Sequence, residues 1–127
     1  GGAEWTFLDG FRAYERWANE FANDPQKPRT SGDAYCYGVY RSTHRAAGNY
    51  LAELAPKYPQ AGDRFLKAGS CFTAEADILD QAETLLWWNS PEGVDAQRNQ
   101  EAGRVLVEAC SLYRQGIEGI EAALKVL

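Results

Sequence analysis

The stretch RFLKAGSCFTAEADILDQAETLLWW, residues 64–88, decides the fold of this chain. Its apolar residues recur every three or four positions, the spacing that places side chains on one face of an α-helix. The stripe comprises Phe65, Ala68, Phe72, Leu79, Ala82 and Leu86. Glu75 falls in the middle of this stripe. Because a buried carboxylate is costly without partners, the fold must supply Glu75 with hydrogen bonds or neutralise it.

The rest of the chain predicts three further amphipathic helices. Their apolar residues recur at helical spacing, and their ends carry proline, glycine or a side chain that can cap a helix. The four predicted helices cover approximately residues 10–23, 33–55, 60–89 and 90–127. The expected N-caps are Asp9 for the first helix, Asp33 or Ser31 for the second, and Ser90, followed by Pro91, for the last.

Four such helices, one short and three long, predict an all-α fold, an antiparallel four-helix bundle. Residues 4–8 alternate between polar and apolar, which predicts a short extended lead-in before the first helix. A chain of 127 residues is long enough for one helical domain, residues 1–127, with a core of its own. The chain has no methionine and opens with Gly1-Gly2, so we expect a fragment of a larger protein.

Composition and charge argue against several classes of function. The net charge is −5 and the basic residues are scattered singly, unlike the basic patch of a nucleic-acid-binding protein. No apolar run approaches the roughly 20 residues that cross a bilayer, so we expect no membrane partner. Cys36, Cys71 and Cys110 lie far apart without a paired spacing. That usage is typical of a reducing compartment, and we expect a cytoplasmic protein.

The second predicted helix offers partners for Glu75. Tyr37, Tyr40 and His44 follow three- and four-residue steps along one apolar seam. Arg41 lies at the edge of that seam, about one turn from His44, which is the only histidine of the chain. These five residues form the candidate ligand-binding site.

Three interpretations of Glu75 remain open. In the first, which the pattern favours, Arg41 or Arg45 and a tyrosine hydroxyl hold the carboxylate and the group is purely structural. In the second, the polar side chains line a pocket between helices and bind a small ligand. In the third, Glu75 and His44 perform acid–base catalysis. No catalytic residue is assigned.

Metal and thiol chemistry lack a supporting motif. Di-iron bundles need a Glu-x-x-His motif on each of two helices, and His44 has no glutamate at the required offset. We therefore expect no metal site and no cofactor. The sequence also allows a Cys71–His44–Glu75 group, but a cysteine on an apolar helix face is usually inert packing.

Two segments carry a resemblance to a known family. They are Asp9-Gly-Phe-Arg-Ala-Tyr-Glu-Arg-Trp17 and Ala34-Tyr-Cys-Tyr-Gly-Val-Tyr-Arg-Ser-Thr-His-Arg-Ala-Ala-Gly-Asn-Tyr-Leu51. Together they resemble the helical part of bacterial proteins related to papain-like cysteine peptidases and to the butirosin-biosynthesis acyltransferase. The resemblance implies that the catalytic cysteine and histidine belong to a papain-like portion outside this chain, because no cysteine here matches them. It also implies that these helices form a lid, a substrate-site wall or a dimer surface.

We therefore expect a non-catalytic helical domain that binds a small ligand or forms a substrate-site wall for a neighbouring domain. One alternative is a structural or oligomerisation module with a purely structural polar core. A weaker alternative is an enzyme that uses Glu75 and His44 for acid–base chemistry. The expected partners are a small molecule, a neighbouring domain of the parent protein, or a second copy of the chain.

Overall fold

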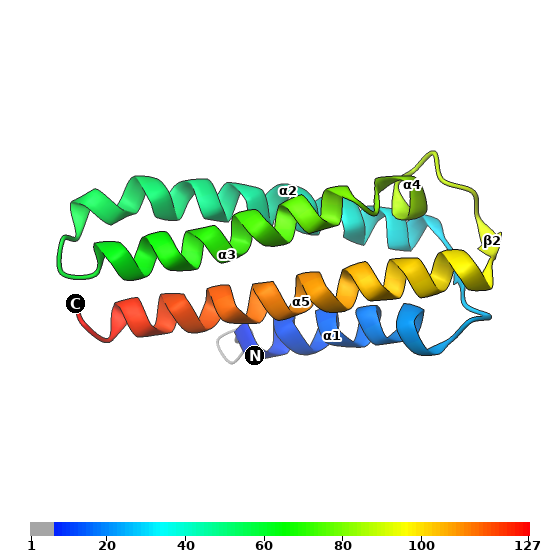
Figure 1. The fold of residues 1–127 in the computed structure, drawn as a ribbon, viewed down its shortest axis with the longest axis horizontal. Coiled ribbons are helices and arrows are strands. Elements are labelled where there is room, and N and C mark those ends of the chain that lie inside the picture. Colours follow the sequence, from blue (N-terminus) through cyan, green and yellow to red (C-terminus); the bar gives the residue numbers. More distant parts are fainter. Residues whose placement is uncertain (1–6) are drawn as a thin grey trace, which may run out of the picture.

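The computed structural model describes residues 7–127, with side chains from residue 10 onward. It has the expected all-α fold, in which four long helices form an antiparallel bundle (Figure 1). These helices are α1 (Phe7–Asn23), α2 (Ser31–Leu54), α3 (Gly62–Asp80) and α5 (Ala96–Leu124). The shorter elements are η2 (Ala55–Lys57), α4 (Glu83–Leu86) and the antiparallel strands β1 (Pro28–Arg29) and β2 (Gly93–Val94). No helix in this part of the chain is long and apolar enough to cross a membrane.

The described part of α1 covers only a portion of the bundle, which divides the molecule into two halves (Figure 1). α3 packs against both α2 and α5, whereas α1 packs chiefly against α5. Phe11, near the start of α1, lies beside Arg114, midway along α5. We call the portion that includes α1, α4 and α5 up to Arg114 the four-helix half. The three-helix half comprises residues 47–72 and 117–127.

The close packing of α1 on α5 depends on glycine at position 103. A Cβ at Gly103 would lie 2.5 Å from the Cα and backbone nitrogen of Ala22 on α1. That distance is far inside van der Waals contact, so any larger residue would force the two helices apart. Gly103 therefore allows α1 to complete the four-helix half.

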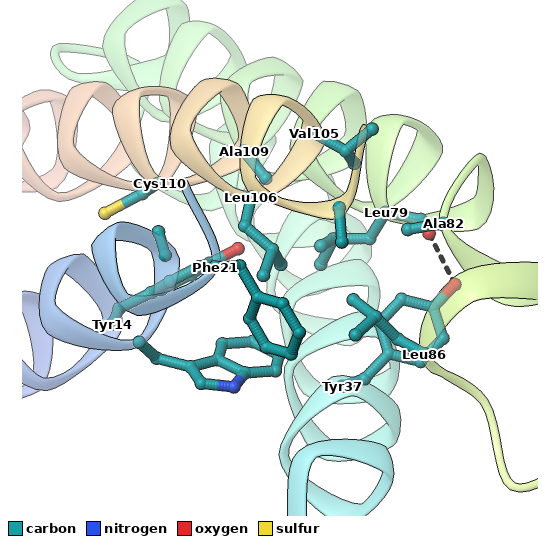
Figure 2. Close-up of a cluster of buried hydrophobic side chains, with 13 residues drawn as sticks. Tyr14, Phe21, Tyr37, Leu79, Ala82, Leu86, Val105, Leu106, Ala109 and Cys110 are labelled. Atoms are coloured by element: carbon teal, nitrogen blue, oxygen red, sulfur yellow. Dashed lines mark hydrogen bonds between the residues drawn. The ribbon is translucent and has the colours of Figure 1, made fainter. Parts of the chain in front are cut away.

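Each half has its own hydrophobic core. In the four-helix half, Tyr14, Tyr37, Leu79 and Leu106 converge from α1, α2, α3 and α5 (Figure 2). The buried members of the second core, in the three-helix half, are Leu51, Ala55, Ala61, Phe65, Ala68, Phe72 and Ala123. Tyr113 packs against both cores and marks the boundary between them.

The predicted starts of the first two helices are wrong. α1 already includes residues 7–9, so Asp9 is not its N-cap; residues 4–6 of the expected extended lead-in lie outside the described residues. The N-cap of α2 is Thr30, whose hydroxyl accepts a hydrogen bond from the backbone N–H of Asp33. The Asp33 carboxylate accepts in return from the Thr30 backbone N–H, 2.8 Å away. This reciprocal pair is a capping box.

The third predicted helix is interrupted after α3. The Tyr37 hydroxyl donates a hydrogen bond to the Leu79 carbonyl (Figure 2). In an unbroken helix that carbonyl would accept from the backbone N–H of Glu83. Here it accepts from Ala82 instead, at 2.9 Å, and the chain turns before α4 begins.

The last long helix begins later than predicted. Its N-cap is Asp95, which accepts from the backbone N–H of Arg98 at 3.0 Å, and not Ser90. Buried Arg29, on β1, donates to the carbonyls of Ser90 and Pro91 and holds this segment against the first loop. Gly93 adopts a φ of +104°, a conformation that glycine tolerates best. These long-range contacts keep residues 91–95 out of a helix.

Candidate functional site

Glu75 is completely buried and is held by two other helices. It lies on α3 with 0% of its surface exposed. Its Oε2 accepts a hydrogen bond from the Tyr14 hydroxyl of α1 at 2.7 Å. The same oxygen lies 2.5 Å from Nδ1 of His44 on α2. One carboxylate oxygen thus joins three helices at the boundary between the two halves.

His44 is half-buried in a stack of aromatic rings. Its imidazole lies parallel to the ring of Tyr113, with 4.8 Å between the centroids, and 5.3 Å from that of Tyr40. Tyr40 stacks in turn on Tyr14 at 4.5 Å. The packing fixes the orientation of the imidazole, so Nδ1 is directed at Glu75 without further hydrogen bonds being needed.

Burial dominates the electrostatics of this cluster. It raises the pKa of Glu75, although the hydrogen bond and charge of His44 and the hydrogen bond from Tyr14 act in the opposite direction. Burial, followed by the charge of Glu75, raises the pKa of Tyr14 well above its ordinary value. The pKa values of Tyr40 and Tyr113 are also raised, chiefly by burial. The tyrosines therefore remain neutral hydrogen-bond donors at physiological pH.

The carboxylate of Glu75 is only half satisfied. Oε2 has both contacts described above, whereas Oε1 is buried without a hydrogen-bond partner among the described residues. Buried polar atoms almost always have a partner, and an unpaired one carries a penalty of about 1–3 kcal/mol. Among the described residues, Glu75 shares this feature only with Asn99, whose Oδ1 is also buried without a partner.

The structure divides the five candidate residues of the sequence analysis into two groups. His44 contacts Glu75 directly, and Tyr40 packs on its aromatic surroundings. Tyr37 instead donates to the carbonyl of Leu79.

Arg41 also lies away from Glu75. Its guanidinium pairs with Glu83 at 3.1 Å and with Asp80 at 3.7 Å, and it stacks over the ring of Trp87. Arg45 pairs with Asp80 and Asp77 on the surface. Neither of the two arginines expected to hold Glu75 reaches it; the imidazole of His44 contacts it instead.

Sequence reasoning missed Tyr14 and Tyr113. Both lie on the apolar faces of their own helices, at spacings that ordinary core aromatics share. Nothing in a local pattern distinguishes a tyrosine that donates to a buried carboxylate from one that only packs. Which tyrosines reach the boundary between the two halves depends on the tertiary arrangement of the helices.

An apolar groove between α2 and α5 begins next to this cluster. It encloses about 350 Å³ in the three-helix half. Its lining is Ala47, Tyr50, Leu51, Leu54, Tyr58, Phe65, Ile120, Leu124 and Leu127. Ala47 lies on α2 one turn beyond His44, so the groove extends from the aromatic stack to the end of the bundle. Tyr50 and Leu124 at its rim are 60% and 56% exposed.

The chemistry available at this site is limited. Among the described residues, no group of three or more metal-binding side chains lies together. Burial raises the pKa of the Cys110 thiol to about 12 and also raises that of Cys36, so neither thiol is activated as a nucleophile. Cys36 is exposed, whereas Cys110 is buried.

Comparisons with models of protein families, with curated proteins and with solved structures found no match.

Proposed function

We propose that this chain is a non-catalytic helical binding domain whose recognition surface is the α2–α5 groove. The observation that carries the proposal is the composition of the groove, because every side chain that lines it is apolar or aromatic. Its volume of about 350 Å³ lies within the range of small-molecule sites in proteins. A non-catalytic role fits the neighbouring polar cluster, in which Glu75 and His44 contact each other inside packed aromatic rings.

The two halves of the molecule explain why the groove is open. In the four-helix half, α1 lies over α2 and α5 and buries Tyr14, Trp17 and Phe21 against them. In the three-helix half, the apolar faces of α2 and α5 continue beyond the described part of α1. Leu124 and Tyr50 are left at the rim. Burying a side chain of this size contributes about 1.5–3 kcal/mol, so an apolar occupant is favoured.

The family resemblance gives this binding role a context. Tyr14 and Trp17 come from the first resembling segment, and Tyr40 and His44 from the second. These residues form one contiguous cluster, with Tyr40 lying 4.5 Å from Tyr14 and 5.7 Å from Trp17 between ring centroids. On the resemblance alone, we propose that the chain belongs to a larger bacterial protein, in which it would form a wall beside a papain-like portion. The free cysteines support a reducing compartment, the cytoplasm.

Binding of a neutral apolar fluorophore, N-phenyl-1-naphthylamine, tests the groove. We expect saturable binding that Tyr50→Ser and Leu124→Gln each weaken by about tenfold, because each removes apolar contact area. Tyr35→Ser is the matched control, since Tyr35 also lies on α2 and is 64% exposed, compared with 60% for Tyr50. Absence of saturable binding, or an equal loss in the control, would contradict the proposal.

A second candidate function is favoured by the unpaired Oε1 of Glu75. A small ligand whose N–H or O–H group reached this oxygen would supply the missing hydrogen bond. Native mass spectrometry of the purified protein tests this site. A retained small molecule that disappears in Glu75→Gln, but not in Glu83→Gln, supports it. Identical spectra for all three proteins would leave Glu75 with a structural role.

A further inference from the structure

The rim of the α2–α5 groove carries exposed apolar side chains on both helices. Tyr50 and Tyr58 on the α2 side are 60% and 41% exposed, and Leu124 and Leu127 on the α5 side are 56% and 51% exposed. We call these four residues the groove rim. They extend the apolar surface beyond the interior of the groove, where a small ligand would lie. A broad, two-sided rim of this kind suits a protein surface.

Some exposed charges on the bundle form ion pairs. In the four-helix half, Arg45 pairs with Asp80 at 2.9 Å and Arg104 with Glu101 at 2.6 Å. Beside the groove rim, four exposed residues have no ion-pair partner among the described residues. They are Glu53, Lys57, Glu121 and Lys125.

The arrangement of these four charges is self-complementary. Glu53 near the end of α2 precedes Lys57 of η2 by four residues, and Glu121 near the end of α5 precedes its C-cap Lys125 by four residues. Each is also the chain neighbour of a residue that lines the groove. When two copies meet about a two-fold axis, equivalent helices can run antiparallel. The acidic residue of one copy then lies opposite the basic residue of the other copy, and its basic residue lies opposite the other copy's acidic residue.

We propose that a second copy of this chain covers the groove rim in a two-fold dimer. This inference rests on the proposed function, because it assigns an occupant to the same groove. On α5, Glu121 lies opposite Lys125 of the partner subunit, and the reciprocal pair forms by symmetry. The apolar rims of the two copies pack between these pairs.

The length of the helical segment in the contact indicates how tightly the two copies associate. The α5 segment from Ile117 to Leu124 is about 12 Å long at 1.5 Å per residue. Two helices of this length form an interface at the low end of the usual range, which is typical of weak association. We expect a dissociation constant in the micromolar range, and sedimentation velocity between about 5 and 500 µM covers it.

Variants that reverse the charge of Glu121 or Lys125 test this dimer. Glu121→Lys places like charges together in the dimer, and we expect it to weaken association at least tenfold. Lys125→Glu should do the same. The double variant Glu121→Lys/Lys125→Glu exchanges both partners at once, and we expect it to restore dimerisation. Recovery in the double variant distinguishes an antiparallel two-fold contact from a general effect of charge. Failure of the double variant to recover would overturn the arrangement.

Apolar variants and fluorophore binding separate this inference from the proposed function. Leu124→Gln should abolish the dimer, whereas Leu66→Gln, at a 48% exposed leucine outside the groove, should not. A chain that stays monomeric at 500 µM but binds N-phenyl-1-naphthylamine would refute the dimer and leave the groove as a ligand site. A monomer without saturable fluorophore binding would refute both. A dimer unaffected by Leu124→Gln would place the interface elsewhere.

Discussion

The four-helix half and the three-helix half are built from the same helices but differ in how completely they are covered. In the first, α1 lies over α2 and α5 and buries the apolar faces of both. In the second, those faces continue beyond the described part of α1, and an apolar groove lies between them. The comparison shows that the same helix pair forms a closed core where α1 covers it and leaves an apolar groove beyond the described part of α1. Stability and binding are therefore expected to depend on different halves.

The largest difference between the halves is expected for two leucines of α5. Leu106 is 0% exposed in the core of the four-helix half, whereas Leu124 is 56% exposed at the groove rim. Leu106→Ala leaves a cavity and should reduce the free energy of unfolding by about 2–5 kcal/mol. Leu124→Ala should change it by no more than about 0.5 kcal/mol. Urea denaturation of the two variants measures both effects, and similar losses would contradict the division into halves.

The next largest loss of stability is expected from a substitution at Gly103, where α1 packs against α5. Gly103→Val places side-chain atoms where the backbone of Ala22 now lies, so α1 must move away. Overpacking of this kind should reduce the free energy of unfolding by about 1–3 kcal/mol. Hydrogen exchange should show faster exchange of the α1 amides than of α3. Gly32→Ala is the control, because a Cβ there meets nothing closer than the Thr30 hydroxyl at 3.5 Å. Unchanged exchange in α1 would contradict the close approach.

A smaller effect is expected from Glu75, at the boundary of the halves. Its pKa is raised by burial above the ordinary value of 4.5. The unfolded chain therefore releases this proton at lower pH than the folded chain does. The stability that protonated Glu75 contributes is present below pH 4.5 and is lost as the pH rises through the raised pKa.

Glu75→Gln removes this titration. We expect the free energy of unfolding of the variant, relative to that of the natural chain, to increase with pH across this window. Urea denaturation at a series of pH values provides the measurement. Glu118→Gln, at an exposed position on α5, should show no such trend. A constant difference between Glu75→Gln and the natural chain would show that burial does not govern this carboxyl group.

The smallest effect on stability is expected for Tyr50→Ser at the groove rim. Because Tyr50 is 60% exposed, the variant should change the free energy of unfolding by no more than about 0.5 kcal/mol. It should nevertheless weaken fluorophore binding and association of the chain. A thermal melt together with the binding assay checks both results. A large loss of stability would assign Tyr50 to the core and weaken the contrast between the halves.

Local sequence patterns predicted the helices well but not all of their boundaries. The faces of α2, α3 and α5 follow from the spacing of apolar residues, which is a property of the chain itself. The break after α3 and the late start of α5 do not follow from any local pattern. In the first case the Tyr37 hydroxyl takes a carbonyl that a continuous helix would use. In the second, Arg29 binds two carbonyls about 60 positions further along the chain.

Local sequence patterns also identified only some of the contacts at the candidate site. A glutamate in an apolar stripe is visible in the sequence, and the only histidine was a natural partner for it. Arg41 and Tyr37 were equally plausible by helical position, yet they contact Glu83 and Leu79. A rotation of α2 by a fraction of a turn selects among these side chains. Local spacing does not specify that rotation.

The amino-acid sequence was therefore sufficient for the all-α fold and for the buried position of Glu75, and it offered His44 as one of several possible partners. These features depend on helical periodicity and on the high cost of an unpaired buried charge, which act at the level of single helices. The role of Tyr14, the half-satisfied carboxylate and the open groove arise from how far α1 extends over α2 and α5. That relation joins residues distant in the chain, and it becomes visible only when the helices are packed together.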